Sequence, residues 1–303
     1  MNRVFSYLTF DSLQSSSNKG ELYLLAGIGL WVALIQISIA AAQLVLATLI
    51  CIWFMLLNRG RFHWVSLPIN KPIALYAGLS LLAAFFSFDP IFSLHESRKL
   101  LLLIVPYFLV STINQTNHVE KLIWLLIIVA DLSAILGLWQ YHFAGHNDID
   151  HRITGFMSHY MTYSGLLMSV SVFALSQLLF GRKHRVFLFL SLILIVAALV
   201  LTLTRSAWIG VFLASLVLIY LKDKRLLLFA PLVVASVTLV LPNHVEHRFG
   251  SFIRPDSSGW DRIYMLRAGV SIVENHPWFG VGLNNVGNVY PIYRIQEAPD
   301  RAN

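Results

Sequence analysis

Arg205 stands between two long apolar stretches of the sequence, residues 186–203 and 207–221, with threonine and serine as its close neighbours. Each stretch is long enough, or nearly so, to cross a bilayer as a helix, which takes about 17–25 residues. Arg205 is therefore predicted at the tip of a helical hairpin. Two interpretations stay open. The guanidinium either snorkels to the lipid headgroups or binds an anion, for which a diphosphate is the natural candidate because guanidinium pairs with phosphate oxygens in a bidentate way.

Two other basic segments carry residue types suited to the same ligand. Arg152 and His159 lie in a polar stretch between two apolar ones, and Arg262 lies in a C-terminal segment, residues 258–276. If the membrane places these segments and Arg205 on one face, they form a positive vestibule open to lipid. Such a site suits a lipid-linked diphosphate, because arginines can hold the phosphates while the isoprenoid tail stays in the bilayer.

The histidines do not predict a metal site. His142, His146, His151 and His159 lie close together in the sequence, but they lack the carboxylate companions and the tight spacing of a metal-binding motif. The single cysteine, Cys51, lies inside an apolar run and offers neither a disulfide nor a thiolate metal site.

Asp131 is an acidic residue inside the apolar stretch of residues 122–141. A charge within a membrane helix is by default a functional candidate, and in a transporter Asp131 would be the proton-relay residue. It could equally pair with a serine or glutamine of a neighbouring helix and fix the packing. The sequence leaves both interpretations open.

The composition is that of a membrane protein with several spans. Of 303 residues, 57% are hydrophobic and 12% charged, whereas a soluble domain carries roughly 25% charged residues. The net charge of +7 could indicate a nucleic-acid partner, but the charges fall in short loops between apolar runs. We therefore expect membrane lipids and no nucleic acid as partners. The polar N-terminal residues lack the apolar core and cleavage site of a secretory signal.

The apolar runs predict an all-α fold, a polytopic transmembrane bundle of about nine spans. We expect a transmembrane domain over residues 1–241 and an outer-face loop segment over residues 242–303. The spans are predicted at about residues 22–37, 40–57, 73–88, 100–113, 122–141, 161–180, 186–203, 207–221 and 226–241.

The C-terminal segment is predicted to carry an amphipathic helix over about residues 258–276, ended by Pro277. This helix could lie on the outer leaflet or simply cover the bundle. After it, Gly280 and Gly282 resemble the start of a dinucleotide-binding loop, but no strand precedes them, so a tight turn is predicted instead. The apolar residues that recur at helical spacing are Trp260, Ile263, Tyr264, Leu266, Val270 and Val273.

Lysines and arginines of the short loops orient the bundle. If the N-terminus is cytoplasmic, most of them fall on its side, and only Arg98, Lys99, Arg152 and Arg205 lie on the other. Cytoplasmic loops carry the excess of lysine and arginine, so this orientation is predicted. It puts Arg152, Arg205 and the C-terminal segment together on the outer face, which is periplasmic in a Gram-negative bacterium.

Three stretches of the sequence resemble the O-antigen ligase and polymerase superfamily of bacterial inner-membrane proteins. Their order and membrane context match over about residues 149–293. The combination is specific for the superfamily and does not name a member. The stretches are Arg152-Ile153-Thr154-Gly155-Phe156 before a span, Leu203-Thr204-Arg205-Ser206-Ala207-Trp208 at a hairpin, and Asp261-Arg262 followed by Asn275-His276-Pro277-Trp278-Phe279-Gly280-Val281-Gly282.

The resemblance implies an enzyme of lipopolysaccharide biosynthesis in the inner (cytoplasmic) membrane. It would transfer a glycan from undecaprenyl diphosphate to a saccharide or lipid acceptor on the periplasmic face, as a glycosyltransferase that needs no metal and no cofactor. Arg152, Arg205 and Arg262 match arginines of the family pattern. They would be the catalytic residues, binding the diphosphate and stabilising charge on the leaving group, with His159 as a further substrate-binding residue.

The family pattern continues with a His-x-Asn-type segment that carries the presumed general base, and this sequence ends at Asn303 before it. We therefore expect a fragment whose base lies beyond Asn303, with His159 and His276 as substitutes. O-antigen polymerisation and glycan transfer to a protein hydroxyl are alternatives within the same chemistry. A small-anion transporter of the bicarbonate type and a scaffold for polysaccharide machinery are alternatives of other classes.

Overall fold

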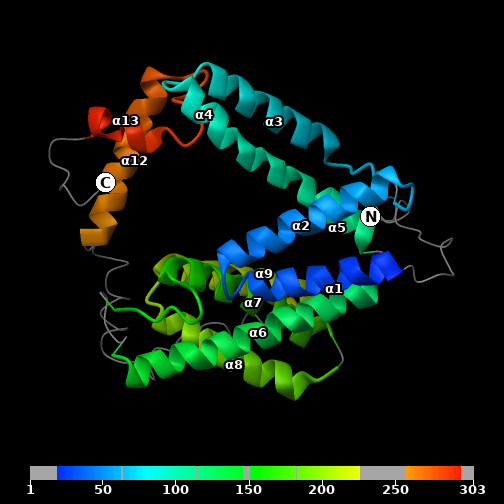
Figure 1. Cartoon of the computed structure of the whole chain (residues 1–303). Coiled ribbons are helices and arrows are strands. Elements are labelled where there is room, and N and C mark those ends of the chain that lie inside the picture. The colour runs from blue at the N-terminus through cyan, green and yellow to red at the C-terminus, as the bar shows by residue number, and fades with distance from the viewer. Residues whose placement is uncertain are drawn as a thin grey trace. The chain divides into compact units, whose positions relative to one another are not determined.

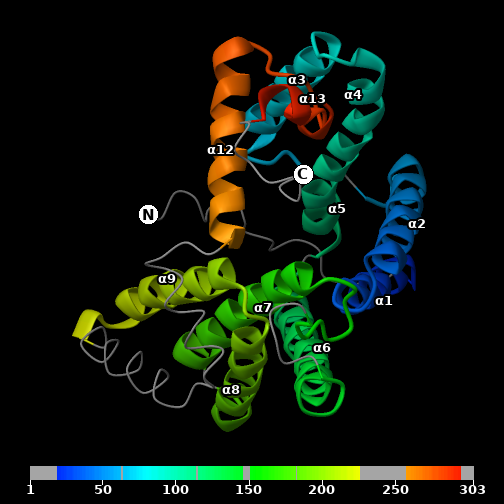
Figure 2. The same cartoon turned by 90° about the vertical axis from the view of Figure 1, so that its left-hand side faces the viewer.

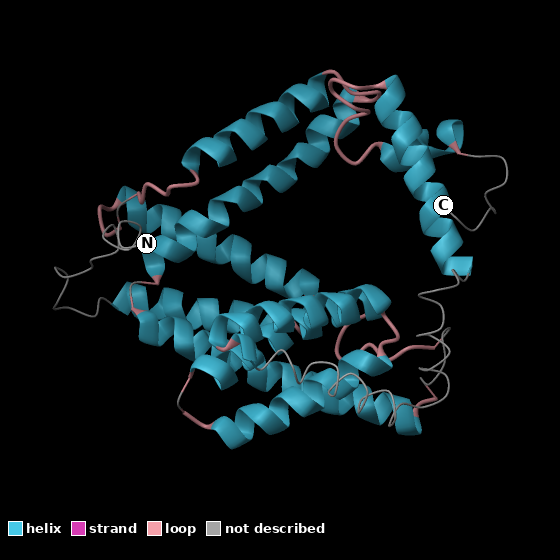
Figure 3. Ribbon diagram, turned by 180° about the vertical axis from the view of Figure 1, so that it is seen from behind, coloured by secondary structure: helices cyan, strands magenta, loops and turns pink. Residues whose placement is uncertain are grey.

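The computed structural model describes residues 19–62, 64–113, 115–145, 151–181, 183–225 and 257–294. Within these ranges the regular elements are helices and there is no β-strand (Figure 3), which confirms the all-α prediction. The chain forms two compact units. Unit 1 comprises Met1–Arg61 and Thr112–Gly250, and unit 2 comprises Phe62–Ser111 and Ser251–Asn303.

Unit 1 is a helical bundle in its described part (Figure 1). The helix α7 packs against α6, α8 and α9, and α1 packs against α2 and α6; Figure 2 shows α6 to α9 side by side. The buried core of this bundle includes Ile127 of α6, Leu167 of α7 and Ile195 of α8. The helices are α1 (Lys19–Leu34), α2 (Ile39–Asn58), α6 (Thr116–Phe143), α7 (Tyr160–Phe180), α8 (Arg185–Leu201) and α9 (Arg205–Lys222).

Four helices, α2, α6, α7 and α9, are long and apolar enough to cross a membrane, and α1 and α8 are apolar but shorter. Only 11–33% of each long helix's most apolar window is buried inside the protein, so most of that surface is available to lipid. These are the features of a multi-pass membrane protein. The count of nine spans stays a prediction, because the ninth, at about residues 226–241, lies outside the described residues.

Two polar side chains join helices within unit 1. The buried Gln36 donates a hydrogen bond from Nε2 to the Leu126 carbonyl of α6 at 2.9 Å. Asp131 of α6 accepts a hydrogen bond from the Ser191 hydroxyl of α8, while its Oδ1 is buried and has no hydrogen-bond partner among the described residues. Asp131 therefore pairs with a serine of a neighbouring helix, which is one of the two interpretations that the sequence left open.

Unit 2 contains the predicted third and fourth spans and the described C-terminal helices. The prediction of one helix over residues 100–113 is corrected to a 3₁₀-helix followed by a short α-helix. Pro106 explains the break, because proline lacks the N–H that would continue an α-helix through this point. The elements are α3 (Asn70–Phe85), α4 (Pro90–Glu96), the 3₁₀-helix η2 (Ser97–Ile104), α5 (Val105–Thr112), α12 (Ser257–Asn275) and α13 (Val286–Tyr293).

The helix predicted in the C-terminal segment is confirmed as α12, which ends before Pro277. Its buried side chains are Ala268 and Ile272, and Ile272 packs with Val281 and with Val289 of α13. On the predicted apolar face, Leu266, Val270 and Val273 are 68%, 51% and 63% exposed. That face therefore does not make the contact with α13, and both the membrane role and the covering role of the helix stay predictions.

Candidate anion-binding site

The loop that carries Arg152 is held by one side chain of α6. Gln140 Oε1 accepts hydrogen bonds from the N–H groups of Thr154 at 3.0 Å and Gly155 at 2.9 Å, and its Nε2 donates to the Gly155 carbonyl at 3.0 Å. Ile153, next to Arg152, is fully buried in the core of unit 1. The backbone on the C-terminal side of Arg152 is thus fixed by a polar anchor and an apolar one.

Gly155 makes a close approach that only glycine allows. Its φ of +57° lies in the left-handed region, which costs other residues roughly 1–2 kcal/mol. A Cβ at this position would lie 2.5 Å from both Ser133 Oγ and Tyr163 Cε2. The Ser133 hydroxyl accepts from the Phe156 N–H at 3.3 Å, and the Tyr163 hydroxyl donates to the Ser133 carbonyl at 2.9 Å. The glycine of the Arg152 motif is therefore required by packing.

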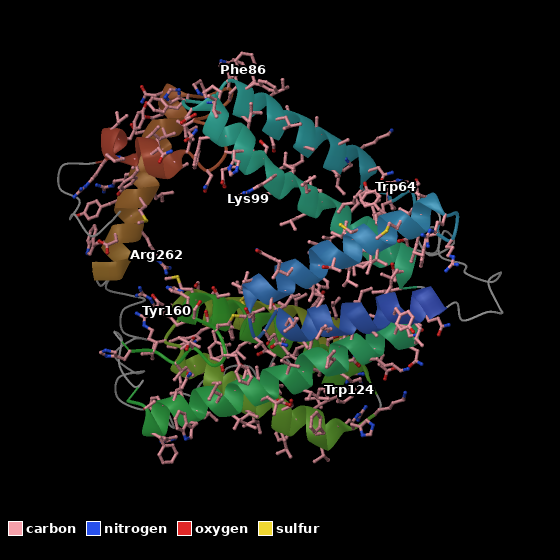
Figure 4. All side chains as sticks on the ribbon, in the orientation of Figure 1. Trp64, Phe86, Lys99, Trp124, Tyr160 and Arg262 are labelled. Atoms are coloured by element: carbon pink, nitrogen blue, oxygen red, sulfur yellow. The ribbon has the colours of Figure 1, made fainter. Side chains whose placement is uncertain are left out.

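The Arg152 guanidinium lies over an aromatic ring. Its Cζ is 4.2 Å from the centre of the Tyr160 ring. Tyr160 is the first residue of α7 and is labelled in Figure 4. The exposed His159 ring stacks on Tyr160 with centroids 4.6 Å apart, and His159 Nδ1 accepts from the Met161 N–H at 3.2 Å. A guanidinium stacks through its flat face and donates through its edge, so this arrangement orients Arg152 in a way compatible with phosphate binding.

Arg205 is the first residue of α9, and α8 ends at Leu201, so Arg205 lies at the turn between two helices, as predicted. Beyond this turn, α8 and α9 pack mainly on α7 and little on each other. The Thr202 hydroxyl donates to the Leu199 carbonyl at 2.7 Å, and Trp208 Nε1 donates to the same carbonyl at 3.2 Å. Leu203 is buried at a φ of +53°, so the turn is tightly packed. Arg205 itself is partly exposed at a helix N-terminus, where backbone N–H groups also favour an anion.

The structure brings Arg152, His159 and Arg205 to the same end of unit 1. They lie where α6 and α8 end and where α7 and α9 begin, and the neighbouring Ile153 and Ala207 share one buried core. Sequence reasoning missed three of the residues that shape this end: Gln140, Ser133 and Tyr163. The signal for Gln140 was a lone amide close to the end of a predicted span.

Arg262 belongs to unit 2. It is exposed on α12, and Figure 4 labels it. The neighbouring Asp261 has a buried Oδ1 without a hydrogen-bond partner among the described residues. Because Arg262 lies in a different unit from Arg152 and Arg205, the convergence of the three arginines stays a prediction.

The motif around Gly280 and Gly282 is a tight turn, as predicted, with φ of +63° and +98° at the two glycines. The turn docks on α4 through two asparagines that sequence reasoning missed. The fully buried Asn285 donates to Ser93 Oγ at 2.8 Å and to the Asp89 carbonyl at 3.2 Å. Asn284 donates to Glu96 Oε2 at 3.1 Å.

Glu96 also forms an ion pair with Lys99, 2.6 Å between Oε2 and Nζ. The hydrogen bond from Lys99, aided by the charges of Lys99, Arg98 and His95, holds the pKa of the Glu96 carboxyl below its ordinary value. The carboxylate is therefore charged at neutral pH and able to accept from Asn284. Its contribution to this docking is present above the ordinary glutamate pKa and is lost as the pH falls through the lowered one.

Metal ligands do not gather in the described residues: no three His, Cys, Asp or Glu side chains are placed to hold an ion there. His146 lies outside those residues. In unit 2, the partly buried His276 shares a hydrogen bond of 2.9 Å between Nε2 and the Tyr293 hydroxyl.

Residues 190–302 match the family model described as O-antigen ligase, Wzy_C. This part of the chain is similar to the O-antigen ligase family. The match covers Arg205, Arg262 and His276, and it leaves Arg152 and His159 outside. No curated protein and no solved structure matches the chain significantly. The match confirms the resemblance that the sequence motifs indicated, over residues 190–302.

Gln140 provides a test of how the Arg152 loop is held. We expect Gln140→Leu to lower the free energy of unfolding by about 1–3 kcal/mol, because two N–H groups and one carbonyl of the loop lose their partner. Gln140→Glu should lose less, since its carboxylate still accepts from both N–H groups. Thermal unfolding of the purified protein in detergent measures the effect. Gln43→Leu, at an exposed position of α2, is the control, and equal stability of the two leucine variants would show that Gln140 does not anchor the loop.

Proposed function

We propose that the chain belongs to an enzyme that transfers a glycan from undecaprenyl diphosphate to an acceptor sugar on the periplasmic face of the inner membrane, as an O-antigen ligase does. The observation that carries this proposal is the O-antigen ligase family match over the Arg205 hairpin and α12. The position of Arg152 and Arg205 at one end of a bundle of apolar helices supports it. We further propose about nine spans, with this end facing the periplasm.

In the proposed reaction, the bond between the anomeric carbon of the glycan and the diphosphate oxygen breaks. A bond forms between that carbon and the acceptor hydroxyl, whose proton passes to a general base. Undecaprenyl diphosphate leaves with an additional negative charge, which Arg152, Arg205 and Arg262 would stabilise. His159 would assist in binding the donor. Polymerisation and transfer to a protein hydroxyl share this chemistry and differ only in the acceptor.

A small-anion transporter would depend on Asp131, and the structure gives that residue a packing contact. Its hydrogen bond from Ser191 joins α6 to α8. We therefore expect Asp131→Asn to keep glycan transfer within about threefold of wild type, because the amide oxygen still accepts from Ser191 at a modest cost in energy.

The test reconstitutes the protein in liposomes. It measures transfer from a glycan-loaded undecaprenyl diphosphate and bicarbonate uptake in the same preparation. Transfer that survives Asp131→Asn and is absent with Arg205→Ala supports the proposal. Bicarbonate uptake that is lost with Asp131→Asn, in a protein without transfer activity, would establish the transporter instead.

A further inference from the structure

Unit 1 has a second polar site, at the end of the bundle opposite Arg205. A pocket of about 450 Å³ opens there between the first turns of α6, the last turn of α7 and the segment before α8. Trp124, labelled in Figure 4, forms part of its apolar wall. The lining residues are Thr116, Val119, Glu120, Ile123, Trp124, Gln177, Gly181 and Lys183.

The lengths of the helices place this pocket at the edge of a bilayer. The helix α6 has 28 residues, which at 1.5 Å per residue is about 42 Å, whereas the hydrocarbon core is about 30 Å thick. An α6 that crosses the bilayer upright would therefore extend about two turns beyond the core. The 21 residues of α7 only just cross it. The pocket lies where α6 begins and α7 ends, with a tryptophan of the kind enriched at such interfaces.

The pocket presents one negative and one positive group side by side. Glu120 Oε1 and Lys183 Nζ are 3.5 Å apart, and their side chains are 37% and 71% exposed. Exposed ion pairs of this kind contribute little to stability, so a ligand that carries both charges can separate them at small cost. Gln177 and Thr116 add hydrogen-bonding groups, while Val119, Ile123 and Trp124 continue the wall as apolar surface.

We propose that this pocket binds the headgroup of an aminophospholipid such as phosphatidylethanolamine. The ammonium group would donate to Glu120, the phosphate would accept from Lys183, and an acyl chain would follow the apolar side chains of α6. A lone anion such as phosphatidylglycerol fits less well, because Glu120 repels it. Phosphatidylcholine carries a quaternary ammonium that cannot donate a hydrogen bond. This site is separate from the proposed transfer reaction.

The experiment measures binding of short-chain phosphatidylethanolamine, phosphatidylglycerol and phosphatidylcholine to the purified full chain in detergent, by native mass spectrometry. We expect phosphatidylethanolamine to bind about tenfold more tightly than either of the others, the factor that one charge-assisted hydrogen bond provides. Glu120→Gln should remove most of this preference, whereas Lys183→Gln should weaken the binding of all three lipids, because each of them carries a phosphate. Lys121→Gln, beside the pocket but not lining it, should leave the preference unchanged.

Thermal unfolding of each variant checks that the exposed substitutions leave the fold intact. Equal binding of the three lipids, an unchanged preference in Glu120→Gln, or unchanged binding of all three lipids in Lys183→Gln would overturn the proposal. Displacement of the lipid by excess inorganic phosphate would also overturn it, because the site would then recognise a free anion. A stronger binding of phosphatidylglycerol in Glu120→Gln would support the assigned place of the ammonium group.

Discussion

Replacing Arg205 with lysine is expected to slow glycan transfer about a hundredfold or more, the effect typical of removing one donor to a developing negative charge. Lysine keeps the positive charge but loses the planar fork that pairs with two phosphate oxygens. The substitution changes a partly exposed side chain at the start of α9, so the fold should be retained. Transfer is measured as the amount of glycan joined to acceptor per unit time, in liposomes that contain the protein.

The matched control for Arg205→Lys is Arg225→Lys. Arg225 is exposed after the opposite end of α9, so its replacement should leave transfer unchanged. An Arg205→Lys protein that transfers glycan at the wild-type rate would exclude a catalytic role for the guanidinium fork. Loss of transfer together with a lowered unfolding temperature would mean that Arg205 instead stabilises the hairpin.

Gly155→Ala is expected to destabilise the protein by about 2–4 kcal/mol, the sum of left-handed backbone strain and overpacking. The added Cβ would lie 2.5 Å from Ser133 Oγ and Tyr163 Cε2, and both side chains are held by hydrogen bonds within the core. The Arg152 loop would have to move, so transfer activity should fall as well. Thermal unfolding in detergent and the transfer assay measure the two effects.

Gly145→Ala separates strain from packing. Gly145 has a similar positive φ of +73°, but a Cβ there would meet no atom of the described residues within 4 Å. We expect the free energy of unfolding of this variant to fall by about 1–2 kcal/mol, from backbone strain alone. If Gly155→Ala and Gly145→Ala prove equally stable, the close approach of Gly155 to Ser133 and Tyr163 does not determine the position of the loop.

The helices of the described region follow largely from hydrophobic runs. The predicted span at residues 207–221 is α9, Arg205–Lys222, and the predicted helix at residues 258–276 is α12, Ser257–Asn275. These limits depend on local sequence, on apolar spacing and on breakers such as Pro277. The break of the fourth span at Pro106 was also encoded locally, but the prediction treated the apolar run as one helix.

The contacts that build the sites were not predictable in the same way. Gln140 bonds to residues 14 and 15 positions later, and Asn285 bonds to Ser93, 192 positions earlier. A single sequence gives the residue types at these positions but not which pairs meet, because pairing is decided by tertiary packing. Arg205 was found because its charge is costly between two apolar runs, and Arg152 and Arg262 were found because the predicted topology and the family resemblance put them on the same face. The neutral side chains that anchor the Arg152 loop carry no such signal.

We propose that Arg205 and Arg262 bind one diphosphate. The most direct measurement is the affinity of the protein for undecaprenyl diphosphate in wild type, Arg205→Lys, Arg262→Lys and the double variant. We predict that each single change weakens binding about tenfold. The double change should weaken binding by less than the product of the two single factors, because the two arginines share a ligand. An Arg262→Lys protein that binds undecaprenyl diphosphate as tightly as wild type, or two effects that multiply independently, would contradict it.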